Sequence, residues 1–221
     1  MHQSLRLAIL CVAVFCCARP AYAAVCAPAK LVHIVTTDVT PGVQAGSFNA
    51  QPKSFYRIGS DRMRVEEAVD SVNGIHGVMV TAEPNIWMAN LYDNTGKHIV
   101  DPGPTFYAKA PIFYGMPGFP AKFDDLEFGC EADFIAANSL TPARTEQIGG
   151  SRFDVYRVTS GTEAIEILEQ SGTSTPAFAR YYHQGTLVMT LHYDVYSTGL
   201  ANDASLFVAP PGVRYSEVVP R

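Results

Sequence analysis

The feature that most restricts the fold is a succession of short apolar runs, rich in β-branched and aromatic residues, separated by turn sequences such as GSD (59–61), DNTG (93–96) and QG (184–185). The run 186–196 alternates between an apolar and a mostly polar face, the period of a half-buried strand. Short strands joined by tight turns favour antiparallel neighbours over strand–helix–strand crossovers. The expected strands are 31–39, 55–58, 63–67, 75–81, 86–92, 97–100, 153–158, 164–168, 178–183 and 186–196, and only 119–125 and 131–138 look helical.

One segment, 101–120, does not fit a plain antiparallel sheet. It contains five prolines, three glycines and five aromatic residues. Proline cannot donate a ladder hydrogen bond and is excluded from central strands, whereas so many aromatic side chains are unusual in a solvated linker. We therefore expect this segment to lie across an apolar surface as a covering flap. Its aromatic residues are Phe106, Tyr107, Phe113, Tyr114 and Phe119.

Residues 1–23 have the pattern of a cleavable secretory signal. Arg6 precedes an apolar run over 7–18, which is too short for a membrane-spanning helix, and Ala21-Tyr22-Ala23 is a small-residue cleavage site. We expect the product to be periplasmic or secreted, with no integral membrane segment left after cleavage. Because Val25 precedes Cys26, we expect no lipid anchor.

The remainder, 24–221, has a length that suits one antiparallel-β domain, and no repeat or linker divides it. Loss of Arg6 and Arg19 with the signal leaves 14 basic residues against 21 acidic ones. Such a surface disfavours nucleic acid as a partner. The oligomeric state does not follow from the sequence.

Two cysteines, Cys26 and Cys130, follow the signal region. An even pair in an oxidising compartment predicts a disulfide, with two free or buried thiols as the alternative.

No catalytic or cofactor-binding signature accompanies these elements, so we expect neither an enzyme nor a cofactor. The histidines have no short metal-ligand spacing, and the chain lacks a CxxC pair and a GxSxG motif. An acidic stretch over 124–133 lacks the spacing of a calcium loop, so solvated acids are the favoured interpretation over a calcium site. The stretch comprises Asp124, Asp125, Glu127, Glu131 and Asp133.

Several passages together resemble the LolA/LolB-like superfamily of periplasmic, outer-membrane lipoprotein-sorting-like domains. They are FYRIG (55–59) leading to MRVE (63–66), IWMANLY (86–92), QIGGSRFDVYRV (147–158) and SLFVAPPGV (205–213). The resemblance implies a strongly curved antiparallel sheet, or incomplete β-barrel, whose concave side holds lipid or acyl chains under short helices and loops. The chain departs from the family at its start, where 31–39 reads as a strand and not as an amphipathic helix.

Three functional hypotheses remain. The first is an exported binding protein whose apolar concave pocket takes a lipid, acyl chain or similar hydrophobic molecule. The second is a structural or interaction protein of the cell envelope whose concavity is filled by its own side chains. The third is an enzyme with scattered catalytic residues. For the first hypothesis, the expected ligand-binding residues are Trp87, Phe106, Tyr107, Ile112, Phe113 and Tyr114.

Overall fold

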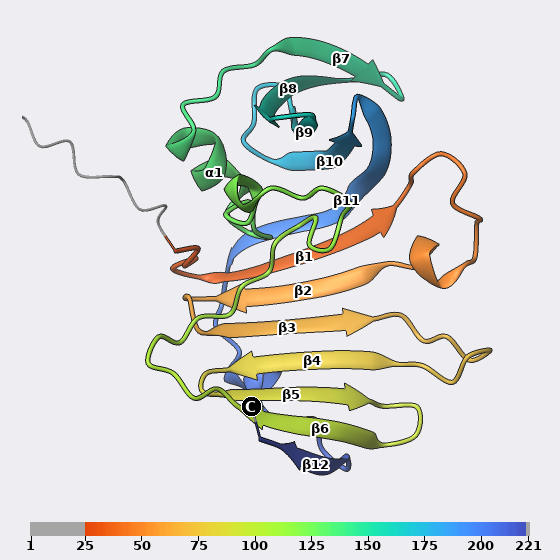
Figure 1. Cartoon of the computed structure of the whole chain (residues 1–221), viewed down its shortest axis with the longest axis vertical. Coiled ribbons are helices and arrows are strands. Elements are labelled where there is room, and N and C mark those ends of the chain that lie inside the picture. Colours follow the sequence, from red (N-terminus) through yellow and green to blue (C-terminus); the bar gives the residue numbers. More distant parts are fainter. Residues whose placement is uncertain (1–24, 220–221) are drawn as a thin grey trace, which may run out of the picture.

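A computed structural model describes residues 25–219 (Figure 1). Most of the regular structure is β. The strands are β1 (Leu31–Asp38), β2 (Lys53–Ile58), β3 (Arg62–Glu67), β4 (Gly77–Ala82), β5 (Asn85–Asn90), β6 (Thr95–Val100), β7 (Arg144–Ile148), β8 (Ser151–Ser160), β9 (Glu163–Gln170), β10 (Pro176–His183), β11 (Thr186–Leu200) and β12 (Arg214–Val218). The helices are α1 (Glu131–Ala137) and the 3₁₀ turns η1 (Phe48–Ala50), η2 (Ala121–Phe123) and η3 (Ala204–Phe207).

All of these strands belong to one sheet, in the order β12-β6-β5-β4-β3-β2-β1-β11-β10-β9-β8-β7. Two antiparallel meanders, β1–β6 and β7–β11, meet where β1 pairs with β11. β12 adds to the edge of β6 in parallel. Within the described residues the two end strands of this order do not pair, so the sheet is open. Figure 1 shows β7–β10 turned away from the plane of β1–β6, which makes the sheet strongly curved. The predicted fold class is confirmed.

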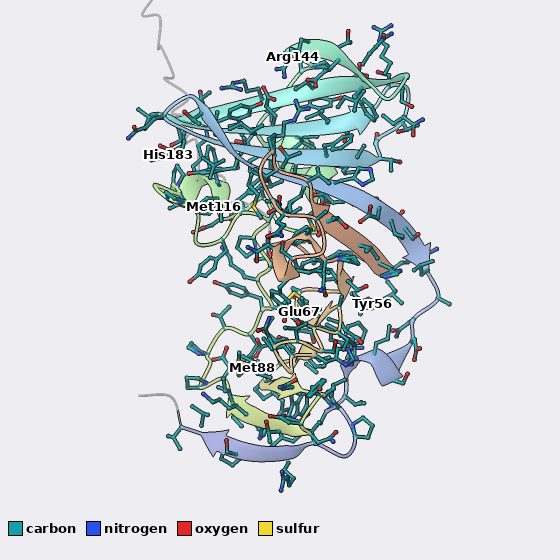
Figure 2. All side chains as sticks on the ribbon, turned by 90° about the vertical axis from the view of Figure 1, so that its right-hand side faces the viewer. Tyr56, Glu67, Met88, Met116, Arg144 and His183 are labelled. Carbon is teal, nitrogen blue, oxygen red and sulfur yellow. A yellow bond between two sulfur atoms is a disulfide. The ribbon has the colours of Figure 1, made fainter. Side chains whose placement is uncertain are left out.

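The pairing register assigns side chains to two faces of the sheet. Phe55 is opposite Val65, Val65 is opposite Met79, and Met79 is opposite Met88. Directly paired residues share a face in an antiparallel sheet, so these four form an apolar strip across β2–β5. The intervening positions, such as Tyr56, point to the other side. In Figure 2 Met88 lies toward the left of the sheet and Tyr56 toward the right.

The chain between β6 and β7 crosses the face that carries this strip, and we name residues 101–140 the covering segment (Figure 1). Its middle is bound by backbone hydrogen bonds, from Ala108 N–H to the Ser60 carbonyl and from Ile112 N–H to the Leu126 carbonyl. Its buried apolar residues complete the main core against β1, β2 and β8–β11. They are Ala108, Ala110, Ile112, Phe113, Phe123, Leu126, Phe128 and Phe134.

The connection from β11 to β12 passes over the opposite face, on the right of Figure 2. It includes η3, which contacts β3 and β4. The Phe207 side chain is buried there, as are Val78, Val80 and Ala89 on the strands. Both faces of β4 and β5 therefore carry apolar residues, and on this face Val78, Val80 and Ala89 are buried by the chain itself.

The expected strands are confirmed with shifts of a few residues at their ends. The expected helix at 131–138 is α1, and the one at 119–125 is reduced to the 3₁₀ turn η2. The DNTG sequence is not wholly a turn, because β6 begins at Thr95. The edge strands β7 and β12 were not expected.

A disulfide joins Cys26 to Cys130, as the sequence predicts. It links the stretch before β1 to the N-terminal end of α1. Among residues 25–219 no helix is long and apolar enough to cross a membrane. The expected signal, 1–23, lies outside the described residues.

An ionic network centred on the buried Glu166 links the strands on the outer face of β7–β10. The Glu166 side chain, 1% exposed, accepts hydrogen bonds from Arg144 at 2.7 and 3.0 Å and from Arg157 at 2.7 Å. Tyr182 donates a further hydrogen bond to it at 3.0 Å. Burial raises the pKa of Glu166, but these hydrogen bonds outweigh burial and bring the pKa to about 2, below the ordinary 4.5.

This network predicts an acid-sensitive contribution to stability. Because the folded-state pKa is depressed, the Glu166 carboxylate stabilises the fold above the unfolded-state pKa of 4.5, and this stabilisation is lost as the pH falls toward 2. Urea unfolding should therefore find Glu166→Gln less stable than the wild type at about pH 5, with the difference shrinking at about pH 3. A difference that does not change with pH would contradict the assignment.

Candidate functional site

The concave side of the sheet is divided into a filled half and an open half. Under β8–β11 the space is occupied by the protein's own side chains, and Ile165, Ile167, Tyr181 and Phe113 are each at most 1% exposed. Over β2–β6 the covering segment leaves part of the sheet free, and Met88 is 47% exposed. The open half is the candidate site.

The central part of the site is an apolar cavity of about 410 Å³ between β2–β4 and the covering segment. Phe55 and Phe128 both line it, and their rings stack with 4.0 Å between centroids. The only charged residues that line it are Lys109 and Asp124. Its other lining residues are Met63, Val65, Met79, Ala110, Pro111 and Tyr114.

A second cavity of about 520 Å³ lies beyond Tyr114, toward β1 and β11. It shares Phe55, Phe128, Pro111 and Tyr114 with the central cavity. These four residues are therefore the boundary between the two spaces. The second cavity is more polar at its margin, where Thr36, Asp38, Asn49 and Lys53 join Ile112, Met116, Pro117, Val188, Met189 and Leu191.

A third, more open hollow of about 700 Å³ continues from the central cavity toward the sheet edge. It shares Val65 and Met79 with the central cavity and adds the exposed Met88. Gly77 provides room there, because a Cβ at this position would collide with the Glu67 carboxylate. The polar rim of the hollow comprises Glu67, Asn90, Thr95, Lys97 and Ser216.

The covering segment is anchored to the sheet by a buried ion pair. Arg57 of β2 lies 2.8 Å from Glu127, and both side chains are 4% exposed. Arg57 also donates to the Cys26 and Ala108 carbonyls, and Glu127 accepts a hydrogen bond from Ala110 N–H at 2.9 Å. The roof of the central cavity is thus connected to its floor by charge-assisted hydrogen bonds.

A second buried carboxyl anchors α1 to β11. Glu131 is 0% exposed and accepts hydrogen bonds from the hydroxyls of Tyr193 at 2.9 Å and Tyr196 at 2.7 Å. Burial raises the pKa of Glu131 above its ordinary value, although these hydrogen bonds oppose the rise. The interpretation of the acidic stretch as solvated is therefore wrong for Glu127 and Glu131, which are buried with partners from distant strands.

The expected ligand-binding residues occupy different places. Tyr114, 80% exposed, borders two cavities, and Ile112 lines the second. Phe113 is 1% exposed and belongs to the core. Phe106 and Tyr107 are exposed and line none of the three spaces found in the described chain.

Trp87 lies on the face opposite the site. Its register partners are Val80 and His98, and its ring stacks on His98 at 5.4 Å. Trp87 lies beside Met88 in sequence but points away from the apolar strip, so its fluorescence does not report directly on the open half.

The site also contains residues that were not expected from the sequence. They are the strand residues Phe55, Val65, Met79 and Met88, together with Phe128 of the covering segment. A simple alternation marks one face only in the run 63–67, where Met63 and Val65 alternate with polar residues. In 86–92 apolar residues stand on both faces, so the pattern does not single out Met88. No group of three or more His, Cys, Asp or Glu side chains is placed to hold a metal ion within the described part of the chain.

No protein-family model and no curated protein matches this chain. Among solved structures, an uncharacterized conserved protein from Thermus thermophilus matches with a TM-score of 0.51 and 10% identity, covering 86% of this chain and 91% of the other. This match shows a shared fold. Two structures of PNGF-II match at 12% identity with TM-scores of 0.38 and 0.35, and this chain spans about a third of their length, 32% and 31%.

Proposed function

We propose that this protein is exported and binds an amphiphile with one apolar chain along the open half of its concave face. The chain of the ligand would lie on Phe55, Val65 and Met79, and its polar head would meet the rim around Glu67 and Lys97. The secretory pattern of 1–23 and the resemblance to LolA/LolB-like domains support the same reading, and the Cys26–Cys130 disulfide suits an oxidising compartment.

The observation that carries the proposal is the continuity of the apolar strip. The central cavity and the open hollow share Val65 and Met79, so apolar surface continues from beneath the covering segment to the exposed Met88. A concave, mainly apolar site with a few polar groups at one end is the usual form of a small-molecule site. Each methylene buried there contributes about 0.8 kcal/mol before association costs.

The test compares two charged substitutions on neighbouring strands. Met88 and Val100 are 47% and 45% exposed, but Met88 points into the site and Val100, opposite Asn85, points to the other face. Displacement of an environment-sensitive hydrophobic dye by lysophosphatidylcholine should be saturable for the wild type and for Val100→Glu. For Met88→Glu the affinity should fall by about tenfold or more, because a carboxylate would lie beside the apolar chain.

Two results would contradict the proposal. One is the absence of saturable binding by the wild type to any single-chain amphiphile. The other is equal weakening by Met88→Glu and Val100→Glu, which would mean that the dye and lipid bind elsewhere. Thermal unfolding of both variants provides the control for folding.

The filled half favours a second candidate, a structural or interaction protein of the cell envelope. Ile165, Ile167 and Tyr181 are closed off from solvent by the chain's own packing. If the wild type binds no amphiphile, this candidate becomes the preferred one.

A further inference from the structure

We infer that Tyr114 is a gate that sets the length of the apolar chain this site accepts. The inference rests on the proposed function and deepens it, since it concerns which amphiphiles fit. Closed, Tyr114 ends the site at the central cavity; displaced, it joins that cavity to the second one.

Tyr114 stands between two empty spaces. It lines both the 410 Å³ cavity over β2–β4 and the 520 Å³ cavity over β1 and β11. The other residues common to both are the stacked rings of Phe55 and Phe128 beneath and Pro111. Pro111 forms a β-bridge with Glu127, which the Arg57 ion pair holds. Of the four residues that separate the two cavities, Tyr114 is therefore the one whose side chain is largely exposed and not held by packing or hydrogen bonds to other described residues.

The turn that carries Tyr114 is fixed on both sides. Before it, Phe113 is 1% exposed and packs on the Tyr181 ring at 5.7 Å. After it, the Tyr181 hydroxyl donates a hydrogen bond to the Pro117 carbonyl at 2.7 Å. Because the residues on either side of Tyr114 are fixed, its side chain can move without unfolding of the covering segment.

The Tyr114 ring itself is weakly held. It is 80% exposed, and no hydrogen bond to its hydroxyl is found within residues 25–219. The next residue, Gly115, has a φ of +78° and nothing within 4 Å of where a Cβ would be. Displacing this ring therefore costs little buried area, whereas a fully buried aromatic would resist.

The lining residues of the two cavities determine how the position of Tyr114 affects ligand length. The central cavity is mainly apolar, with Lys109 and Asp124 as its charged lining residues, and the second has Asp38, Lys53 and Asn49 at its margin. A short chain fits within the first, and a long chain must push Tyr114 aside to reach Val188, Met189 and Leu191 of the second. The ring thus limits the affinity gained by chains that are longer than the central cavity.

Binding of a saturated series from octanoate to stearate, measured by dye displacement, tests the gate in Tyr114→Ala. In the wild type, affinity should rise with length and then level off. In Tyr114→Ala the rise should continue, and the preference for stearate over dodecanoate should grow by about tenfold, the effect of burying one or two more methylenes. Tyr107→Ala removes an exposed aromatic side chain of the same segment that lines none of the cavities, so its dependence of affinity on chain length should match that of the wild type. Tyr114→Phe should also match the wild type, because it keeps the ring that separates the two cavities.

The outcomes separate this inference from the proposed function. If the wild type binds no member of the series and no lysophospholipid, the proposed function fails. If the wild type binds but Tyr114→Ala has the same length profile, the gate is refuted while the site stands. A change shared equally by Tyr114→Ala and Tyr107→Ala would also refute it, because the effect would then belong to surface aromatics in general.

Discussion

The double variant Cys26→Ala/Cys130→Ala is expected to lose about 4–5 kcal/mol of unfolding free energy, on the chain-entropy estimate for so long a loop. The disulfide spans a sequence separation of 104 residues, so its loss frees a large part of the unfolded chain. The loop contains β1–β6 and most of the covering segment. Urea unfolding of the variant and the oxidised wild type measures the difference.

Reduction of the wild type provides a second route to the same quantity. The reduced protein and the double variant should have similar midpoints, since both lack the cross-link. A loss below about 1 kcal/mol in both would mean that the unfolded chain is already restricted without the bond, against the entropic account.

Arg57→Met is expected to destabilise the protein by about 3–5 kcal/mol, because it leaves the Glu127 carboxylate buried without its cation. Both side chains are 4% exposed, and the pair links β2 to the covering segment. Chemical unfolding gives the loss in stability, and hydrogen exchange of the covering segment should accelerate, because the Ala108 and Cys26 carbonyls also lose a donor.

A surface ion pair in the same segment is the matched control. Lys109 lies 3.7 Å from Asp125, and the two side chains are 41% and 44% exposed. Lys109→Met should therefore cost less than about 1 kcal/mol. The double variant Arg57→Met/Glu127→Met should be more stable than Arg57→Met alone, because no buried charge remains. Equal losses for Arg57→Met and Lys109→Met would refute the role of the buried pair.

The fold was largely predictable because most strands have one apolar face and end in strong turn sequences. The strands that escaped prediction, β7 (RTEQI) and β12 (RYSEV), lie at the two edges of the sheet and have largely exposed side chains. Without a buried face they lack the apolar alternation that reveals a strand. β12 also pairs in parallel with β6, a partner distant in sequence that no local turn indicates.

The candidate site was only partly predictable, because alternation shows that a strand has two faces and not which face is covered. In β5, Met88 and Trp87 point to opposite sides, and both sides carry apolar residues. The side that becomes the site is decided by where the covering segment and η3 pack. The burial of Glu127 and Glu131 likewise depends on partners from β2 and β11.

The central place of β1 in the sheet has a consequence for the order of folding. β2–β6 and β7–β11 can pair with near neighbours, but Val35 of β1 must find Val195 of β11 almost at the other end of the chain. Loop closure over so many residues makes such a contact slow to form. The pairing of β1 with β11, which joins the two meanders, should therefore be completed late. The second cavity, beyond Tyr114, is lined by Thr36 of β1 and by Met189 and Leu191 of β11. The apolar strip on β2–β5 can therefore form before the second cavity does. A partly folded chain would then expose the strip to solvent while the second cavity is still absent.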